Sequence, residues 1–300
     1  MNIIIADVRF SISCKDVPLV EPPRADTYAP FIVDTMPNNK EFLNFGVSIE
    51  LDNLPSVGKS TKIFQTPDSW SLYNSGDEYF WTGTTVHPEK GFSCIARFHR
   101  RPHEVTIHCG DILVTEEEGT KMLMNPFSYQ LDQFLLVYAL AEREGALLHA
   151  CAVELSGKGY VFPGRSGAGK STISGIFVSR GHSVLSDDRA VVRKIGDAFR
   201  VFGTPWSGTA GIAENRSLPL NGIFFIVHGE ENKVEKLSPK EAFERLMPVT
   251  SILWYDAKVL PSMLSFCEDL AMNIPAYDLH FRPQEEVVGL LERMTDNAGC

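Results

Sequence analysis

The sequence has no excess of positive charge. Its 28 Lys and Arg residues face 38 Asp and Glu residues, which gives a formal net charge of −10 at pH 7. A protein that binds nucleic acid without regard to sequence neutralises phosphates with Lys and Arg. The acidic balance therefore argues against nucleic acid as a partner and favours small ligands or individual proteins.

Long apolar runs and paired cysteine motifs are also missing. No apolar stretch approaches the roughly 18 residues that a membrane-spanning helix requires, so we expect no membrane partner. The chain does not open with a charged and then apolar leader. None of the six cysteines stands in C-x-x-C spacing, and these features predict a reduced, cytoplasmic protein. The cysteines are Cys14, Cys94, Cys109, Cys151, Cys267 and Cys300.

The chain contains enough apolar residues for a sizeable core. Hydrophobic residues make up 44% of its 300 positions, which suits one large domain or two ordinary ones. Residues 1–124 alternate short strand-like stretches with turn signals and predict a mainly β N-terminal module that serves recognition or assembly. A helical pattern over residues 126–145 marks the boundary, so residues 125–300 are expected to form the second domain.

The tetrapeptide Gly-Lys-Ser-Thr occurs twice. A phosphate-binding loop has the form G-x-x-x-x-G-K-[ST], because glycines let consecutive N–H groups turn inward while the lysine reaches the outer phosphate oxygens. The pattern closes in residues 164–171. In the earlier copy, residues 58–61, Asn53 stands where the first glycine is required, and Pro55 removes a backbone donor. We expect phosphate binding at the later copy alone.

The neighbours of the later copy support this choice. A short apolar segment, residues 159–163, precedes the loop, a helical run follows it as far as Gly181, and residues 183–195 read as another strand. This order predicts an α/β fold with a P-loop nucleotide-binding core. The expected nucleotide-binding residues are Gly164, Arg165, Ser166, Gly167, Ala168, Gly169, Lys170, Ser171 and Thr172.

Two adjacent aspartates, Asp187 and Asp188, follow the apolar residues of the next strand. Ligands of open α/β sheets bind at such strand ends. Mg²⁺ that bridges two phosphates needs the Ser171 hydroxyl and usually a nearby carboxylate, so one aspartate can serve the metal while the other faces an acceptor. Neighbouring strand residues point to opposite faces, so both can act only if the strand ends or kinks there. The alternative is that one aspartate caps a turn.

Four further side chains are candidates for the site. His149 lies in an apolar strand before the loop; its default role is that of a hydrogen-bonded core residue, but its ring could reach the phosphates. Thr204 and Trp206 stand in a turn-rich segment and could contact an acceptor, or could belong to a packed hairpin connection. Arg216 is a candidate for neutralising a transferred phosphate, or a surface arginine.

The segment from residue 147 to residue 192 resembles the catalytic domain of HPr kinase/phosphorylase, whose fold is related to that of phosphoenolpyruvate carboxykinase. That family combines a histidine on the strand before the loop, the loop itself and an Asp-Asp pair after R-G-H-x-(L/V). Here His149, residues 164–171 and the pair Asp187 and Asp188 match in order and in approximate spacing. The likeness covers roughly residues 145–250.

The resemblance implies a role for each matching residue. Lys170 would hold the β- and γ-phosphates of ATP, and Ser171 would hold Mg²⁺. Asp187 would take the proton of the acceptor hydroxyl, while Asp188 and His149 would assist through the metal and through proton or charge placement. The family's hexamers make a homo-oligomer plausible.

The chain also departs from the family. Residues 202–222 lack its glycine-rich, acid-containing signature, and the β-rich N-terminal half is unlike its N-terminal domain. Two hypotheses therefore remain: a kinase that moves the γ-phosphoryl group of ATP to a hydroxyl of a small molecule, a peptide or a protein serine, and a nucleotide-sensing regulatory module that transfers nothing. The paired aspartates favour the kinase, because a sensor needs no second acid to accept a proton.

Overall fold

The computed structural model describes residues 1–15, 17–20, 25–34, 41–66, 69–84, 92–99, 102–117, 119–128 and 130–297. The chain forms two compact units: residues 1–26 with 32–138, and residues 27–31 with 139–300. This division differs from the expected boundary at residue 125, because it falls inside helix α1 (Leu131–Glu142). The ring of Phe134 on α1 packs against Trp70 and Phe98, so the start of this helix belongs to the first unit.

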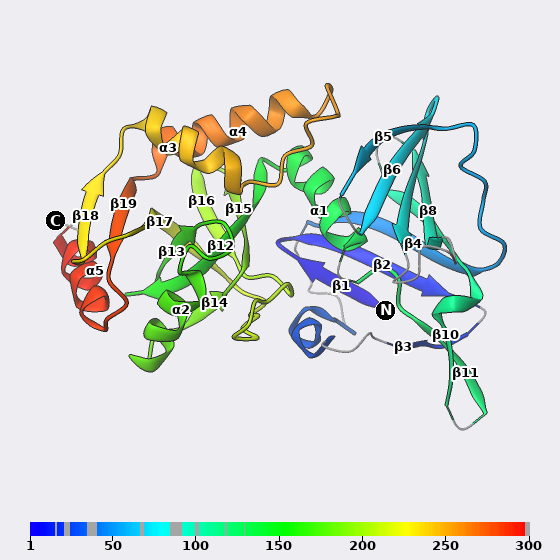
Figure 1. Ribbon diagram of the computed structural model, residues 1–300, viewed down its shortest axis with the longest axis horizontal. Coiled ribbons are helices and arrows are strands. Elements are labelled where there is room, and N and C mark those ends of the chain that lie inside the picture. Colours follow the sequence, from blue (N-terminus) through cyan, green and yellow to red (C-terminus); the bar gives the residue numbers. More distant parts are fainter. Residues whose placement is uncertain are drawn as a thin grey trace. The chain divides into compact units, whose positions relative to one another are not determined.

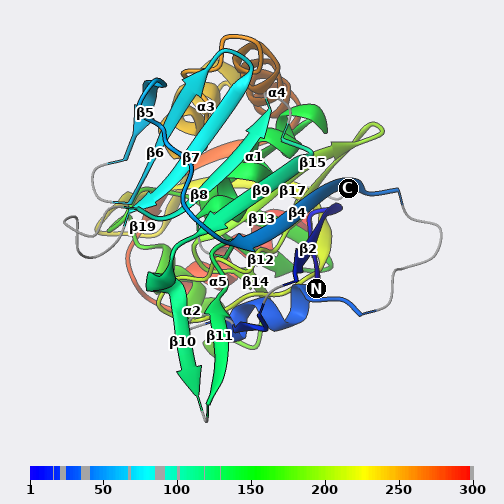
Figure 2. The same ribbon diagram turned by 90° about the vertical axis from the view of Figure 1, so that its right-hand side faces the viewer.

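The first unit is built mainly from β-strands. One eight-stranded sheet has the order β1-β2-β4-β9-β8-β7-β6-β5, and a three-stranded sheet has the order β10-β11-β3 (Figure 2). Alternate residues of β2, among them Val8, Phe10 and Ile12, are buried, as expected for a strand with one face on a core. The strands are β1 (Asn2–Ile5), β2 (Val8–Cys14), β3 (Leu19–Val20), β4 (Leu43–Leu51), β5 (Thr61–Gln65), β6 (Trp70–Ser75), β7 (Glu78–Thr84), β8 (Phe92–His99), β9 (Glu104–Cys109), β10 (Val114–Glu117) and β11 (Thr120–Met124). The 3-10 helix η3 (Asp111–Leu113) also belongs to this unit, whereas the 3-10 helix η1 (Ala25–Phe31) contributes residues 27–31 to the second unit.

The second unit is a mixed α/β structure. Its eight-stranded sheet has the order β13-β12-β15-β16-β17-β19-β18; β14 pairs with β12, and β13 also pairs in parallel with β17. The strands are β12 (Gly145–Leu155), β13 (Lys158–Pro163), β14 (Val184–Ser186), β15 (Arg189–Ile195), β16 (Ala198–Phe202), β17 (Ser217–His228), β18 (Lys233–Lys236) and β19 (Ala276–Phe281). The helices are α2 (Lys170–Ser179), α3 (Pro239–Leu246), η4 (Met247–Val249), α4 (Leu260–Asn273) and α5 (Glu286–Asn297).

The long strand β12 separates two apolar cores. Ala150 and Ala152 belong to the core that includes residues of α3 and α4, whereas Cys151 and Val153 belong to the core that includes residues of α2 and α5. This alternation follows the two-residue period of a strand. Within this unit, Figure 1 shows α3 and α4 along one side of the strands and α2 on the other. β12 is therefore buried on both faces, which explains its almost continuous apolar sequence.

The strand expected over residues 183–195 is interrupted. It forms β14 and β15, and the two aspartates lie in the break between them. This break fulfils the condition under which both neighbours can act at one site. Among the residues that the structure describes, no helix is long and apolar enough to cross a bilayer. The described cysteines are free thiols, and Cys300 lies outside the described residues.

Candidate active site

The glycine-rich loop of residues 164–169 connects β13 to α2. Gly167 (φ 83°) and Gly169 (φ 103°) adopt left-handed backbone conformations that residues with a Cβ rarely take. A Cβ on Gly164 would lie 2.7 Å from that of Ala168, so the loop closes tightly on itself. The N-terminal end of α2, whose dipole is positive, begins at Lys170. The loop geometry therefore requires the glycines of the motif.

The expected binding residues of this loop offer an open face. Arg165, Ser166 and Gly167 are exposed, as are Ser171 and Thr172 on the first turn of α2. Backbone N–H groups at the start of a helix have no intrahelical partner, so they can donate hydrogen bonds to an anion. The exposed loop is thus a surface that an anionic group can approach.

Lys170 is folded back across the mouth of the loop. The Nζ atom donates hydrogen bonds to the carbonyl oxygens of Gly164 (2.9 Å) and Arg165 (3.3 Å), and the side chain is 6% exposed. Burial lowers the pKa of the Lys170 ammonium, and the nearby carboxylate of Asp188 partly offsets this effect. The same Nζ atom lies 3.8 Å from Asp188 Oδ1. A buried cation therefore faces a carboxylate at the end of the loop.

Asp188 links the loop to strand β12. Its Oδ1 atom lies 2.9 Å from His149 Nε2, and its backbone oxygen accepts a hydrogen bond from Ala150 N (2.9 Å). Burial raises the pKa of Asp188, but the hydrogen bond and charge of His149, followed by Arg189 and Lys170, outweigh it, so the net shift of the pKa is downward. The side chain remains 32% exposed. Asp188 is thus an ionised and accessible carboxylate beside the buried lysine.

Asp187 has a different environment. This residue is 1% exposed, and its two carboxylate oxygens accept hydrogen bonds from Gly208 N (2.7 Å) and Ala210 N (2.8 Å). An acceptor hydroxyl has no access to these oxygens in this structure. The geometry therefore argues against the expected role of Asp187 as the group that takes the acceptor proton, because its carboxylate is buried against the loop that contains residues 208–210 and accepts hydrogen bonds from that loop.

The three candidate acceptor contacts are engaged inside the second unit. Thr204 is fully buried and donates a hydrogen bond to Arg189 O (2.6 Å). Trp206 is 4% exposed and its Nε1 atom donates to the hydroxyl of Tyr28 (2.9 Å). The guanidinium of Arg216 forms ion pairs with Glu214 and Glu154. Each of these side chains thus has an internal partner, and contact with an acceptor or its phosphate stays a prediction.

Thr209 is a residue of the site that the sequence analysis did not single out. It is exposed, and its Oγ1 atom donates to Ser171 Oγ at 3.4 Å. Nothing local in the sequence places it there, since 38 positions separate the two hydroxyls. The signal in the sequence was its position between Gly208 and Gly211, just after the turn-rich segment that holds Thr204 and Trp206.

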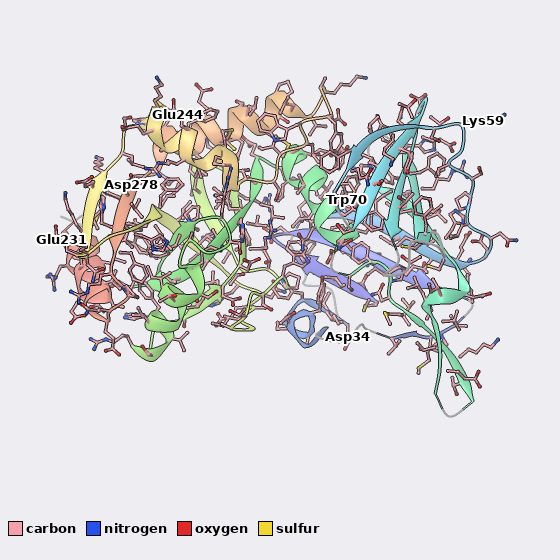
Figure 3. The ribbon with its side chains drawn as sticks, in the orientation of Figure 1. Asp34, Lys59, Trp70, Glu231, Glu244 and Asp278 are labelled. Atoms are coloured by element: carbon pink, nitrogen blue, oxygen red, sulfur yellow. The ribbon has the colours of Figure 1, made fainter. Side chains whose placement is uncertain are left out.

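The earlier Gly-Lys-Ser-Thr copy does not form such a loop. Residues 57–60 make a turn, with Ser60 N bonded to Val57 O (3.0 Å), and strand β5 follows where a phosphate loop would lead into a helix. Figure 3 shows Lys59 at the outside of the first unit, and this side chain is exposed. The structure agrees with the expectation that this copy is not a phosphate loop.

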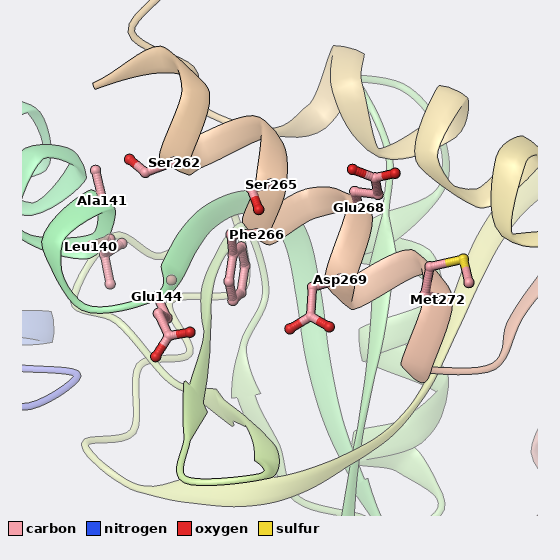
Figure 4. Close-up of a pocket in the computed structure, with 10 residues that line it drawn as sticks. Leu140, Ala141, Glu144, Ser262, Ser265, Phe266, Glu268, Asp269 and Met272 are labelled. Carbon is pink, nitrogen blue, oxygen red and sulfur yellow. The ribbon is translucent and has the colours of Figure 1, made fainter. Parts of the chain in front are cut away.

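A separate cavity of about 550 Å³ lies between the end of α1 and α4. Figure 4 shows the carboxylates of Glu144, Glu268 and Asp269 around it. None of the candidate site residues lines this cavity. Lys194 Nζ pairs with Asp269 (2.6 Å), but three carboxylates still make this lining acidic, which is unfavourable for the phosphates of a nucleotide. The glycine-rich loop, and not this cavity, is therefore the candidate nucleotide site.

Comparison with known families finds a match over more than half of the chain. The family model described as "SynChlorMet cassette protein ScmC" matches residues 120–282. This segment includes β12, the glycine-rich loop, α2 and the two aspartates.

Curated relatives confirm the resemblance seen in the motifs. HPr kinase/phosphorylase of Chlorobium phaeovibrioides is 31% identical over 90 residues, which are 30% of this chain and 25% of the relative. HPr kinase/phosphorylase of Limosilactobacillus reuteri is 38% identical over 81 residues, which are 27% of this chain and 23% of the relative. The chain thus spans about a quarter of the length of these relatives.

A solved structure of the Hpr(Ser) kinase/phosphatase from Coxiella burnetii is also similar. The match has 15% sequence identity and a TM-score of 0.33, and it covers 51% of this chain and 89% of that one.

Proposed function

Because the chain belongs to the ScmC family and its matched segment is related to HPr kinase/phosphorylases, we propose that it is an ATP-dependent kinase that phosphorylates a hydroxyl group. One observation carries this proposal. An accessible carboxylate, that of Asp188, lies between His149 and the buried Lys170 at the mouth of a glycine-rich loop. A carboxylate in this position can serve Mg²⁺, and it can also accept the proton of an acceptor hydroxyl, which only the kinase requires.

In this proposal the glycine-rich loop binds the phosphates of ATP. Its exposed backbone donors and the start of α2 surround the phosphates, as in P-loop proteins. Lys170 exchanges its bonds to the carbonyls of Gly164 and Arg165 for phosphate oxygens. This exchange is favourable because a charged acceptor forms a stronger hydrogen bond than a carbonyl.

The residues at the loop also fit Mg²⁺. The hydroxyl of Ser171 and the carboxylate of Asp188 are hard oxygen donors, which is the ligand type that Mg²⁺ prefers. These two residues would hold the ion. When bound, Mg²⁺ neutralises charge on the β- and γ-phosphate oxygens.

We assign the proton-accepting role to Asp188 in place of Asp187. As the acceptor oxygen bonds to the γ-phosphorus, the bond from that phosphorus to the bridging oxygen breaks and ADP leaves. The acceptor proton passes to Asp188, which the low pKa keeps ionised at neutral pH. His149 holds this carboxylate in place through the 2.9 Å contact. Asp187 instead positions the neighbouring loop.

The acceptor is proposed at the level of its chemistry. HPr kinase/phosphorylases carry HPr in their name, but this chain spans only about a quarter of their length. We therefore propose a hydroxyl of a peptide, a protein serine or a small molecule. Cytoplasmic location and self-association are further parts of the proposal.

A nucleotide sensor is the second candidate. The observation that favours it is that Thr204, Trp206 and Arg216, expected to meet an acceptor, are engaged internally. A sensor would bind ATP with Mg²⁺ and leave the γ-phosphate in place.

Binding and transfer can be tested separately. Lys170→Ala should abolish measurable ATP binding in isothermal titration, because it removes the cation at the loop, whereas the matched change Lys59→Ala in the exposed turn should leave it unchanged. Equal loss in both variants would contradict the assignment of the loop. The intact protein is then incubated with γ-labelled ATP, Mg²⁺ and extracts of peptides, proteins and metabolites. A labelled acceptor supports the kinase; ATP binding without transfer to any of them would favour the sensor.

A further inference from the structure

The two oxygens of Asp187 hold the backbone on both sides of one residue. Oδ1 accepts from Gly208 N and Oδ2 from Ala210 N, so the carboxylate bridges the residue that lies between them, Thr209. A Cβ on Gly208 would lie 3.0 Å from Asp187 Oδ2 and 3.2 Å from Asp188 Cβ. The backbone at Gly208 therefore lies directly against both aspartates, and a larger residue would push it away.

The rest of this segment is held from other directions. Glu214 N donates to Leu185 O (2.9 Å), and Asn215 Nδ2 donates to Pro30 O (3.0 Å). With the bond from Trp206 to Tyr28, these contacts fix the segment before and after the residues that Asp187 holds. The segment that contains Thr209 is thus built into the second unit.

The hydroxyl of Thr209 projects to the start of α2. Its Oγ1 atom lies 3.4 Å from Ser171 Oγ, and both residues are exposed. Two neighbouring ligands of an octahedral Mg²⁺ ion, each about 2.1 Å from the metal, are about 3 Å apart. The separation of the two hydroxyls is close to this value. An ion held by Ser171 would therefore find the Thr209 oxygen near its next ligand position.

We propose that Thr209 is a second hydroxyl ligand of the Mg²⁺ that accompanies the nucleotide, and that Asp187 is the positioning residue that presents it. This inference rests on the proposed nucleotide site. It gives the two adjacent aspartates separate tasks: Asp188 acts beside Lys170, and Asp187 builds the loop that supplies the additional oxygen.

Metal binding tests the inference directly. Mn²⁺ replaces Mg²⁺ as a paramagnetic probe, and its binding to the full chain in the presence of ADP is followed by electron paramagnetic resonance. Thr209→Val keeps the side-chain shape and removes the hydroxyl, and we expect it to weaken Mn²⁺ binding about 10-fold, at the lower end of the range for disturbed metal sites. Thr209→Ser keeps the oxygen and should stay within about twofold of the natural protein. Thr61→Val, at an exposed threonine of β5, is the matched control and should change nothing.

Asp187 is tested through its coupling to Thr209. Asp187→Asn should also weaken Mn²⁺ binding, but in the double variant it should add little to the effect of Thr209→Val, because both changes remove the same ligand. Fully additive losses would overturn the positioning role. Circular dichroism and thermal melting confirm that each variant is folded.

Two results would overturn the role of Thr209 itself. One is unchanged Mn²⁺ affinity in Thr209→Val. The other is phosphate on Thr209, detected by mass spectrometry after incubation with Mg²⁺ and ATP, which would make this hydroxyl an acceptor. In both cases nucleotide binding by the natural protein stays intact, so the proposed function survives. Absence of nucleotide binding by the natural protein would instead overturn both proposals.

Discussion

Asp188→Asn preserves the shape of the side chain and removes its negative charge. In the structure Asp188 Oδ1 lies 2.9 Å from His149 Nε2 and 3.8 Å from Lys170 Nζ. The amide oxygen can still accept from His149, but a charge-assisted hydrogen bond is about twice as strong as a neutral one of about 1 kcal/mol. Since the side chain is 32% exposed, we expect the free energy of unfolding to fall by no more than about 1 kcal/mol.

The expected effect on phosphoryl transfer is larger. Loss of a general base lowers turnover by about 10²–10⁴-fold, which corresponds to about 3–5 kcal/mol in the activation barrier. The assay measures kcat with the labelled acceptor at saturating Mg²⁺, because Asp188 is also proposed to hold the ion. Lys170 and the glycine-rich loop remain, so ATP should still bind, although a higher Mg²⁺ concentration should be needed for activity.

Asp187→Asn is the matched comparison. The Asp187 carboxylate is buried and accepts two backbone N–H groups. An asparagine accepts one of them and presents its own NH₂ group to the other, so a buried donor loses its partner at a cost of about 1–3 kcal/mol in the free energy of unfolding. Asp187→Asn should therefore lose more stability, and Asp188→Asn more turnover. The reverse result would refute the assignment of Asp188 as the proton acceptor and restore Asp187 in that role. In that result Asp188→Asn keeps its full kcat, and Asp187→Asn loses kcat without losing stability.

Two further predictions concern hydrogen bonds and pH. Tyr28→Phe removes the hydroxyl that accepts from Trp206 Nε1, so the free energy of unfolding should fall by about 1–3 kcal/mol. Denaturant titrations followed by tryptophan fluorescence measure this change, and the fluorescence itself should also differ. An unchanged midpoint would show that this hydrogen bond contributes nothing to stability. Because the pKa of Asp188 is lowered in the folded state, its contribution to stability is complete above its unfolded value of 3.8 and is lost as the pH falls through the lower folded value. The difference in free energy of unfolding between the natural protein and Asp188→Asn should thus have its full value at pH 5 and narrow below about pH 4. A difference that grows on acidification would contradict a lowered pKa of Asp188.

The elements that the sequence predicts well are those with local causes. The spacing of Gly164 and Gly169 relative to Lys170 identifies the loop, because the required backbone conformations and the start of α2 lie within a few residues. The turn between β12 and β13, with Ser156 and Gly157 at positive φ, is local in the same way. Helix α3 likewise begins at the capping box of its N-terminal serine.

The expected helix over residues 126–145 shows the limit of such patterns. α1 begins at Leu131, because Asn125 and its neighbours form a hydrogen-bonded turn, with Phe127 N donating to Asn125 Oδ1. Apolar periodicity covers the whole segment, but a side chain that bonds the backbone competes with the first turn of the helix. The domain boundary expected at residue 125 depends on the same segment, whereas the division between the two compact units lies between Tyr138 and Ala139 of this helix.

Local sequence is enough to predict the glycine-rich loop, the strands and helix beside it, and a segment that holds His149 and two aspartates. These features follow from short-range backbone chemistry and from a family motif. The tertiary structure alone decided which aspartate is accessible, because that depends on backbone donors at Gly208 and Ala210, more than 20 positions away. It also decided that Trp206 meets Tyr28 across 178 positions and that Thr209 meets Ser171 across 38. Contacts at such separations have no local signature, since they exist only when distant strands and loops are packed together.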